Sequence, residues 1–237
     1  MQKIIHRAEN RGHADFEWLK SYHSFSFGQY YNPDNIHFGA LRVLNDDHVA
    51  AGQGFGRHPH DNMEIVSIPL SGTLAHSDSM GHGKDIQTGD VQIMSAGTGI
   101  QHSEFNGSKT DDVKFLQIWI IPKEADIEPR YDQKSYAHLD KENKWITIVS
   151  PDEADANAVW INQDSWFNLA DLQKGNTLAY HLHNQTNGIY LFVLEGDVSV
   201  GGEQLGRRDA IGIHDSGNVS IEANADAQLL LIEVPMF

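Results

Sequence analysis

Residues 52–72 have the sequence GQGFGRHPHDNMEIVSIPLSG, in which a histidine pair is followed by an apolar run that ends at a glycine. His58 and His60 are two positions apart, so both side chains lie on one face if this segment is a β-strand. The run Glu64–Leu70 has the length and the flanking turn residues of a buried strand. This segment therefore predicts a β fold in which one strand presents two imidazoles on the same side.

The same pattern of short apolar or alternating runs, separated by glycine, asparagine and aspartate, continues along the chain. Further runs of strand length are Phe38–Leu44, Val91–Met94, Phe115–Ile121, Trp145–Val149, Leu178–Leu182, Ile189–Leu194 and Gln228–Val234. Strands of this length with regular turns are typical of a sandwich or barrel. Helical periodicity is weak, and we expect a helical turn or two only within Asp164–Leu172. The sequence predicts an all-β protein.

A faint internal repeat divides the chain in two. The run IVSIPLSG at residues 65–72 is echoed by YLFVLEG at 190–196, and GDVQIM at 89–94 is echoed by RDAIGI at 208–213. Two copies of one barrel, joined near residues 122–144, would explain this repeat. That connection contains Pro122, Pro129 and a charged stretch, as links between domains often do. We expect an N-terminal domain over residues 1–130 and a C-terminal domain over residues 131–237.

Composition excludes several classes of function. The chain has 17 Lys and Arg against 33 Asp and Glu, a formal net charge of −16, which disfavours direct nucleic-acid binding. It has no cysteine, so disulfides, cysteine-ligated zinc and thiol catalysis are excluded. We expect no secretory signal in the first residues and no membrane span, because neither a cleavable apolar segment nor an apolar run of 18 residues is present. A cytoplasmic location is the default expectation.

A second segment, GDVQIMSAGTGIQHSEFN at residues 89–106, places His102 and Glu104 two positions apart. Two strands facing one barrel interior would bring three imidazole nitrogens and one carboxylate to a single point. The alternative is a solvated pair at His58 and His60 with His102 packed in the core. Surface or local hydrogen-bonding roles are expected for eight other histidines: His6, His13, His23, His37, His48, His76, His82 and His138.

These two segments resemble the two sequence motifs of the cupin superfamily. The versions here, HPHDNME at residues 58–64 and MSAGTGIQHSEFN at 94–106, are similar to those of the pirin family and its bacterial quercetin-dioxygenase members. The likeness continues through HSFSFGQYY (23–31), LRVLNDD (41–47), SDSMG (77–81), LQIWIIP (116–122) and PRYDQ (129–133), and fades in the second half. It implies two tandem cupin barrels, each a double-stranded β-helix of jelly-roll type.

The resemblance also implies a ligand set. His58, His60, His102 and Glu104 are expected to hold one divalent transition metal ion. Ordinary cupins take their carboxylate from the position of Glu64, so Glu64 is the alternative ligand or, failing that, a hydrogen-bond partner of a ligand. Fe(II) is our first choice of metal, although the same ligands also accept Ni, Cu, Co, Mn or Zn.

The second barrel is expected to lack a metal. His181 and His183 form a similar pair, but aligning Gly72 with Gly196 places Leu182 and Asn184 opposite His58 and His60. The same alignment places Gly188 opposite Glu64, and no His-x-Glu follows Gly206.

By resemblance, the expected activity is oxidative opening of a flavonol such as quercetin by dioxygen, with release of carbon monoxide and with Glu104 as general base. Phe25, Phe27, Phe55 and Met94 are candidates either for the substrate pocket or for plain core. One alternative is an iron-dependent, redox-sensing regulatory protein that binds a protein partner. Another is a metal-using isomerase or hydrolase on the same scaffold. We expect a monomer.

Overall fold

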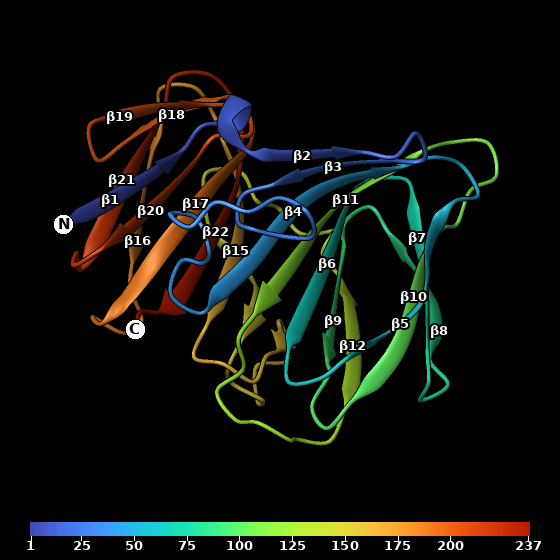
Figure 1. Ribbon diagram of the computed structural model, residues 1–237. Coiled ribbons are helices and arrows are strands. Elements are labelled where there is room, and N and C mark those ends of the chain that lie inside the picture. Colours follow the sequence, from blue (N-terminus) through green and yellow to red (C-terminus); the bar gives the residue numbers. More distant parts are fainter.

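A computed structural model describes all of the chain, residues 1–237. The strands form four sheets, two of seven strands and two of four, and each barrel consists of one large and one small sheet. Figure 1 shows the barrel built mainly from the N-terminal half on the right, in cyan and green, and the other on the left, in orange and red. The predicted all-β fold of two tandem cupin barrels is confirmed.

The N-terminal barrel combines a seven-stranded and a four-stranded antiparallel sheet. In spatial order its large sheet contains β12 (Arg130–Ser135), β9 (Asp90–Ser95), β6 (Glu64–Ser71), β11 (Val113–Ile120), β4 (Leu41–Val49), β3 (Leu19–His23) and β2 (Gly12–Asp15). Its small sheet contains β5 (Gly54–His60), β10 (Ile100–Asn106), β7 (Thr73–Asp78) and β8 (Gly83–Gln87).

The C-terminal barrel repeats this arrangement. Its large sheet contains β1 (Gln2–His6), β20 (Ala210–His214), β17 (Asn187–Glu195), β22 (Ala227–Pro235), β15 (Trp166–Leu172), β13 (Ile146–Ser150) and β14 (Val159–Trp160). Its small sheet contains β16 (Thr177–His181), β21 (Asn218–Ala223), β18 (Asp197–Val200) and β19 (Glu203–Gly206). The one parallel pair is β13 with β14. The structure has a single short 3₁₀ turn, Ala8–Asn10, and no helix with the length and hydropathy for crossing a membrane.

The internal repeat is visible at two glycines. Gly72 joins β6 to β7 and has a φ of +79°, and Gly196 joins β17 to β18 with a φ of +94°. A side chain is strained at a positive φ, and a Cβ on Gly196 would also lie 2.2 Å from the Asp226 carbonyl oxygen. Both tight hairpins therefore depend on glycine at the same place in the repeat.

Two strands pair across the expected division at residue 130. β1, from the start of the chain, pairs with β20 and so extends the large sheet of the C-terminal barrel, where Figure 1 shows it in blue among orange strands. β12 begins at Arg130 but pairs with β9 in the N-terminal barrel. The division into residues 1–130 and 131–237 stays a prediction, and the strand pairing shows that each half contributes a strand to the other.

The two large sheets pack face to face through a core of 25 buried residues. Leu116, Ile118 and Ile120 of β11 point into this core from one sheet, as Leu230, Ile232 and Val234 of β22 do from the other. Alternation along each strand sends the intervening residues into the barrel interiors. Burial of one such side chain adds about 1.5–3 kcal/mol to the free energy of unfolding, and this shared core holds the two barrels together as one packed unit.

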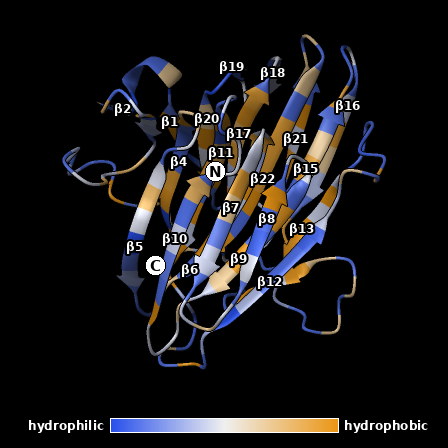
Figure 2. Cartoon of the chain, turned by 90° about the vertical axis from the view of Figure 1, so that its right-hand side faces the viewer, coloured by the Kyte–Doolittle hydropathy of each residue, from blue (hydrophilic) through white to orange (hydrophobic).

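The two barrel interiors differ in polarity. The C-terminal barrel encloses 17 buried apolar residues, whereas the N-terminal barrel has two smaller clusters, of 6 and 4 residues. In Figure 2, β5 and β10 are mostly blue and white, and β22 is mostly orange. Polar residues therefore occupy part of the N-terminal barrel that would otherwise be filled with apolar side chains.

The expected helical turns within residues 164–172 are wrong. Residues 166–172 form β15, which pairs with β22 on one side and β13 on the other. Phe167 faces the core between the sheets and Leu172 faces the barrel interior, so the segment has the two-residue alternation of a strand. Asn168 and Asp171 interrupt the apolar pattern and hide this alternation in the sequence.

Candidate metal centre

The two predicted histidine segments lie side by side. β5 and β10 are antiparallel neighbours in which His102 is opposite His58 and Ile100 is opposite His60. The imidazole centroids of His58 and His102 are 4.5 Å apart, and that of His60 is 4.8 Å from the first and 4.9 Å from the second. The structure thus brings three of the four predicted ligands together, and one ring nitrogen from each lies within 4.8 Å of the others.

The geometry of this cluster fits a metal ion. The Nε2 atoms of His58 and His102 are 3.0 Å apart. Two nitrogens that each lie about 2.1 Å from one ion, at right angles to each other, are separated by about 3.0 Å. His58 Nδ1–H donates to the Gly56 carbonyl oxygen at 2.8 Å, which leaves the lone pair of Nε2 directed at the cluster.

The protonation of the histidines also suits metal binding. Burial, followed by the neighbouring His58, lowers the pKa of His60 to about 4. Burial, with His58 and His60 next, lowers the pKa of His102 to about 2. Both rings are neutral near pH 7, and neutral imidazole is the form that ligates metals.

Glu104 lies beside the histidine cluster, on the side of His102. The register shift in the pairing of β10 with β5 places its extra residue on β5, between Phe55 and His58, so β10 keeps its alternation and Glu104 lies on the same face as His102. The carboxylate is buried; Oε1 accepts a hydrogen bond from Ser67 Oγ at 3.0 Å, and Oε2 accepts one from Gln117 Nε2 at 2.8 Å. Burial raises the pKa of Glu104, and the charge of nearby His76 opposes that rise.

Sequence reasoning missed a second cluster around Glu104. His76 of β7 is opposite Glu104 in the β7–β10 pairing, and ligand atoms of His76, His102 and Glu104 lie within 4.8 Å of one another. The His76 ring is buried, and of the two expected roles, surface or local hydrogen bonding, it has the second, from Nε2 to Asp78 at 3.3 Å. The His76–x–Asp78 alternation was the available signal in the sequence.

Glu64 does not join either histidine cluster. It lies on the face of β6 that also carries Val66 and points between the two large sheets. Its Oε2 accepts hydrogen bonds from Ser95 Oγ at 2.8 Å and from the Asn162 backbone N–H at 3.1 Å. The expectation that Glu64 is a ligand or contacts one is therefore wrong, because Glu64 and the inward-facing Ser67 lie on opposite faces of the strand.

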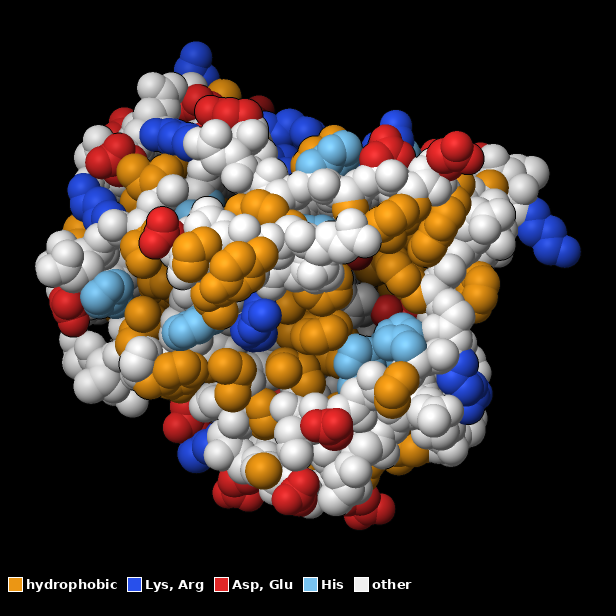
Figure 3. Space-filling model, in the orientation of Figure 1, with side chains coloured by type: hydrophobic (Ala, Val, Ile, Leu, Met, Phe, Trp, Pro, Cys, Tyr) orange, Lys and Arg blue, Asp and Glu red, His pale blue; other side chains and the backbone are white.

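A cavity of about 850 Å³ leads to the cluster, with His58 and Glu104 in its wall. Figure 3 shows a hollow on this face with hydrophobic side chains around it and histidines at its edge. The aromatic residues of its lining are Phe16, Trp18, Phe27, Tyr30, Phe55 and Trp119. Of the four residues expected either in the substrate pocket or in the core, Phe27 and Phe55 line the cavity. Phe25 and Met94 belong to buried apolar clusters.

Known proteins match this chain over its whole length. Residues 5–120 match the family model described as Pirin, and residues 147–234 match that of the quercetinase C-terminal cupin domain. The chain is 41% identical to quercetin 2,3-dioxygenase of Escherichia coli K12 over 98% of both chains. The chain belongs to the pirin family.

Two further relatives extend this comparison. The pirin-family chain is 40% identical to the pirin-like protein of Caulobacter vibrioides, over 94% of this chain and 95% of that protein. It superimposes with a TM-score of 0.93, at 39% identity and full coverage of both chains, on the crystal structure of the bacterial pirin YhhW from Escherichia coli in complex with nickel(II). The resemblance read from the sequence is therefore confirmed.

The second barrel of this pirin-family protein has apolar and aromatic residues where the first has the histidine cluster. In the strand pairing, Glu104 is opposite His76, which lies four residues after Gly72. Val200 lies four residues after Gly196 in the second barrel, and it is opposite Ile221. Val219 then corresponds to His102, and Tyr180, which is opposite Val219, corresponds to His58.

The expected alignment of Leu182 with His58 is thus wrong by two residues. The connection between β16 and β17 is two residues longer than the one between β5 and β6, so the strand lies earlier in the sequence than the alignment assumed. The prediction that this barrel holds no metal now rests on Tyr180, Val219 and Ile221.

Proposed function

We propose that this protein is a metal-dependent dioxygenase that opens flavonols such as quercetin, consuming dioxygen and releasing carbon monoxide. The observation that supports it most is the position of three imidazoles, with two Nε2 atoms 3.0 Å apart, beside a cavity lined with aromatic side chains. The names of the relatives point to the same substrate. We propose His58, His60, His102 and Glu104 as the metal ligands.

The chemistry that a bound redox-active first-row ion supplies is Lewis acidity towards the hydroxyl and ketone oxygens of a flavonol, together with electron exchange with dioxygen. We propose Fe(II) for this ion. Ni, Cu, Co, Mn and Zn remain chemically compatible with the ligands, and the nickel(II) complex was obtained for the relative, not for this chain. Elemental analysis of protein purified without added metal tests the identity of the ion.

Glu104 is proposed as the general base that accepts the proton of the flavonol hydroxyl. Burial raises its pKa, whereas a bound cation would lower it, so Glu104 would act as a base where the ion holds it loosely. Ser67 and Gln117 hold the two carboxylate oxygens in place, and each oxygen keeps a lone pair for a further partner. Phe55 and Trp119 cover the cavity wall and limit the access of water to this proton transfer.

The test is to incubate iron-loaded protein with quercetin and oxygen. We expect the flavonol absorbance to disappear and one molecule of carbon monoxide to be trapped for each flavonol molecule consumed. Glu104→Gln should lower kcat by about 10²–10⁴-fold, the range for loss of a general base. Metal-replete wild-type protein that neither bleaches quercetin nor releases carbon monoxide would refute the proposal.

The remaining expectations stay predictions: a protein partner, a monomeric state and a cytoplasmic location. No feature of the cavity or the cluster specifically favours the redox-sensing regulatory role over catalysis.

A further inference from the structure

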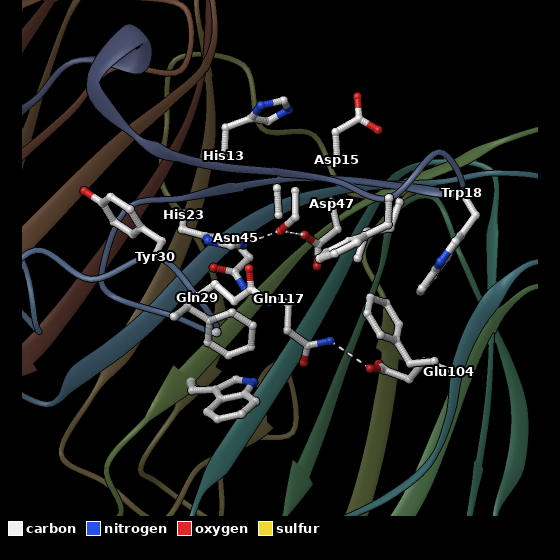
Figure 4. A pocket seen from close by; sticks show the side chains of 18 of the residues that line it. His13, Asp15, Trp18, His23, Gln29, Tyr30, Asn45, Asp47, Glu104 and Gln117 are labelled. Carbon is white, nitrogen blue, oxygen red and sulfur yellow. Dashed lines mark hydrogen bonds between the residues drawn. The ribbon is translucent and has the colours of Figure 1, made fainter.

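The wall of the cavity contains a buried carboxyl group that the proposed reaction does not use. Asp47 of β4 is opposite Ser21 of β3, and both residues line the cavity together with His23. Figure 4 shows Asp47 and His23 in this wall. His23 Nε2 and Ser21 Oγ are 2.7 Å apart, and Ser21 Oγ–H donates to Asp47 Oδ1. These three residues form a continuous hydrogen-bonded chain, which we call the Asp47 chain.

The proton positions along the Asp47 chain follow from its chemistry. A serine hydroxyl has one hydrogen, and here it is donated to Asp47, so Ser21 must accept its second hydrogen bond from His23. Burial, with His13 and Arg11 next, lowers the pKa of His23 to about 4, so the ring is neutral near pH 7. His23 therefore carries its hydrogen on Nε2 and leaves Nδ1 as an acceptor.

The cavity wall has more hydrogen-bond acceptors than donors to satisfy them. His23 Nδ1 and Gln117 Oε1 are buried without any donor, because Gln117 directs its amide N–H to Glu104. Asp47 makes its hydrogen bond through Oδ1 and none through Oδ2. Buried polar groups are nearly always paired in folded proteins, so these atoms are suited to a ligand that brings hydrogen-bond donors.

The rest of the cavity wall is rich in aromatic side chains, which favours an aromatic ligand. Phe27 lies edge-on to Trp119 with their centroids 5.4 Å apart, and Trp18 lies edge-on to Phe55 at the same distance. The cavity volume of about 850 Å³ is within the range of small-molecule sites. The Asp47 chain and the metal centre line this same cavity, so one aromatic molecule can meet both.

We propose that Asp47, held by Ser21 and His23, binds a second phenolic hydroxyl of the substrate, away from the hydroxyl that meets the metal. This inference rests on the proposed function and narrows the substrate class to polyhydroxylated aromatic compounds. Burial also raises the pKa of Asp47 to about 7. A buried carboxyl group is costly for folding, and groups perturbed in this way cluster at functional sites.

The experiment compares two ligands on zinc-loaded protein without oxygen, by quenching of tryptophan fluorescence. Zinc keeps the site filled but does not change redox state, so binding is measured without turnover. Quercetin carries several hydroxyls, whereas 3-hydroxyflavone keeps only the hydroxyl and ketone that face the metal. At pH 8, where Asp47 is ionised, we expect wild-type protein to bind quercetin about 10- to 100-fold more tightly, the range for a hydrogen bond to a charged group.

Three variants identify the group responsible. Asp47→Leu should bring the ratio of the two dissociation constants close to one while 3-hydroxyflavone binding changes less than about two-fold. Asp47→Asn keeps the volume and an acceptor oxygen but not the charge, and should reduce the preference to about 2- to 10-fold, the range for a neutral hydrogen bond. Glu233→Gln is the matched control: Glu233 is a buried carboxylate that accepts from Tyr180 in the other barrel, so the ratio should stay at the wild-type value.

Two results would overturn the inference: equal binding of both ligands by wild-type protein, or an Asp47→Leu variant that weakens both ligands by the same factor. The proposed function is tested separately, by turnover of the iron-loaded protein. If quercetin is preferred but not consumed, the hydroxyl site stands and the dioxygenase proposal falls. If quercetin is consumed without being preferred, the reverse holds.

Discussion

Replacing Asp47 by asparagine should stabilise the protein, and the gain should grow with pH. Burial raises the folded-state pKa of this carboxyl from 3.8 to about 7, the Ser21 hydrogen bond opposes the rise, and the charges of Asp46 and Glu104 add to it. The unfolded chain loses its proton near the ordinary pKa of aspartate. Between these two values the folded state holds one proton more than the unfolded state, so the free energy of unfolding falls as pH rises.

The size of the effect follows from the two pKa values. A difference of one pKa unit is worth about 1.4 kcal/mol, so full ionisation of Asp47 costs the folded state about 4 kcal/mol. The stability that protonated Asp47 provides is fully present when the pH is below the pKa of this group in the unfolded chain, and it is lost as the pH rises above about 7. Asp47 is only 4% exposed, so solvent screening does not reduce this figure much. Between pH 5 and pH 8 the advantage of Asp47→Asn over wild type should grow by about 2.5 kcal/mol.

The assay is urea unfolding of both proteins at pH 5, 6, 7 and 8 with a chelator present, followed by tryptophan fluorescence. Taking the difference at each pH cancels the other titrating groups. Asp112→Asn is the control, because His48 lowers the pKa of this exposed carboxylate and its removal should give no gain at high pH. A wild-type-to-variant difference that stays constant across this range would show that Asp47 is not held neutral by burial.

Three further outcomes test other parts of the structure. His102→Ala should reduce bound metal from about one ion per chain to below about 0.1 by elemental analysis, whereas His181→Ala, in the second barrel, should leave the metal content unchanged. A chelator should lower the Tm of metal-loaded wild-type protein but not the Tm of His102→Ala. Leu230→Ala, in the core between the large sheets, should cost about 2–5 kcal/mol in urea unfolding. Tyr180→Phe removes the hydroxyl that donates to Glu233 and should cost about 1–3 kcal/mol without changing metal content.

The histidine cluster could be predicted because strand geometry is local. Spacing of two residues in each segment puts His58 with His60, and His102 with Glu104, on one face whatever the rest of the fold does. Which strands are neighbours is not local, and this is why His76 was missed: its spacing from Asp78 indicates a shared face, but His76 meets Glu104 only through the pairing of β7 with β10. Motifs show which faces carry ligands, and pairing determines what else lies near them.

Faces of a single strand were harder to assign than strands themselves. Glu64 begins the apolar run of β6, and its distance of four residues from His60 suggested a shared face. The turn at residues 61–63 ends β5 before β6 begins, so side-chain alternation does not continue from one strand into the next. The polar wall formed by Ser21, His23 and Asp47 was also not predicted, since each residue is unremarkable in sequence and only the β3–β4 pairing brings them together.

The placement of β1 has a consequence for the order of assembly during translation. Gln2–His6 is synthesised before the strands of the first barrel, and its partner Ala210–His214 is synthesised after them. The first barrel contains neither segment, so it can close while the leading strand still has an open hydrogen-bonding edge. Completion of the second barrel then pairs that strand with Ala210–His214, which holds segments from both sides of the first barrel in one sheet.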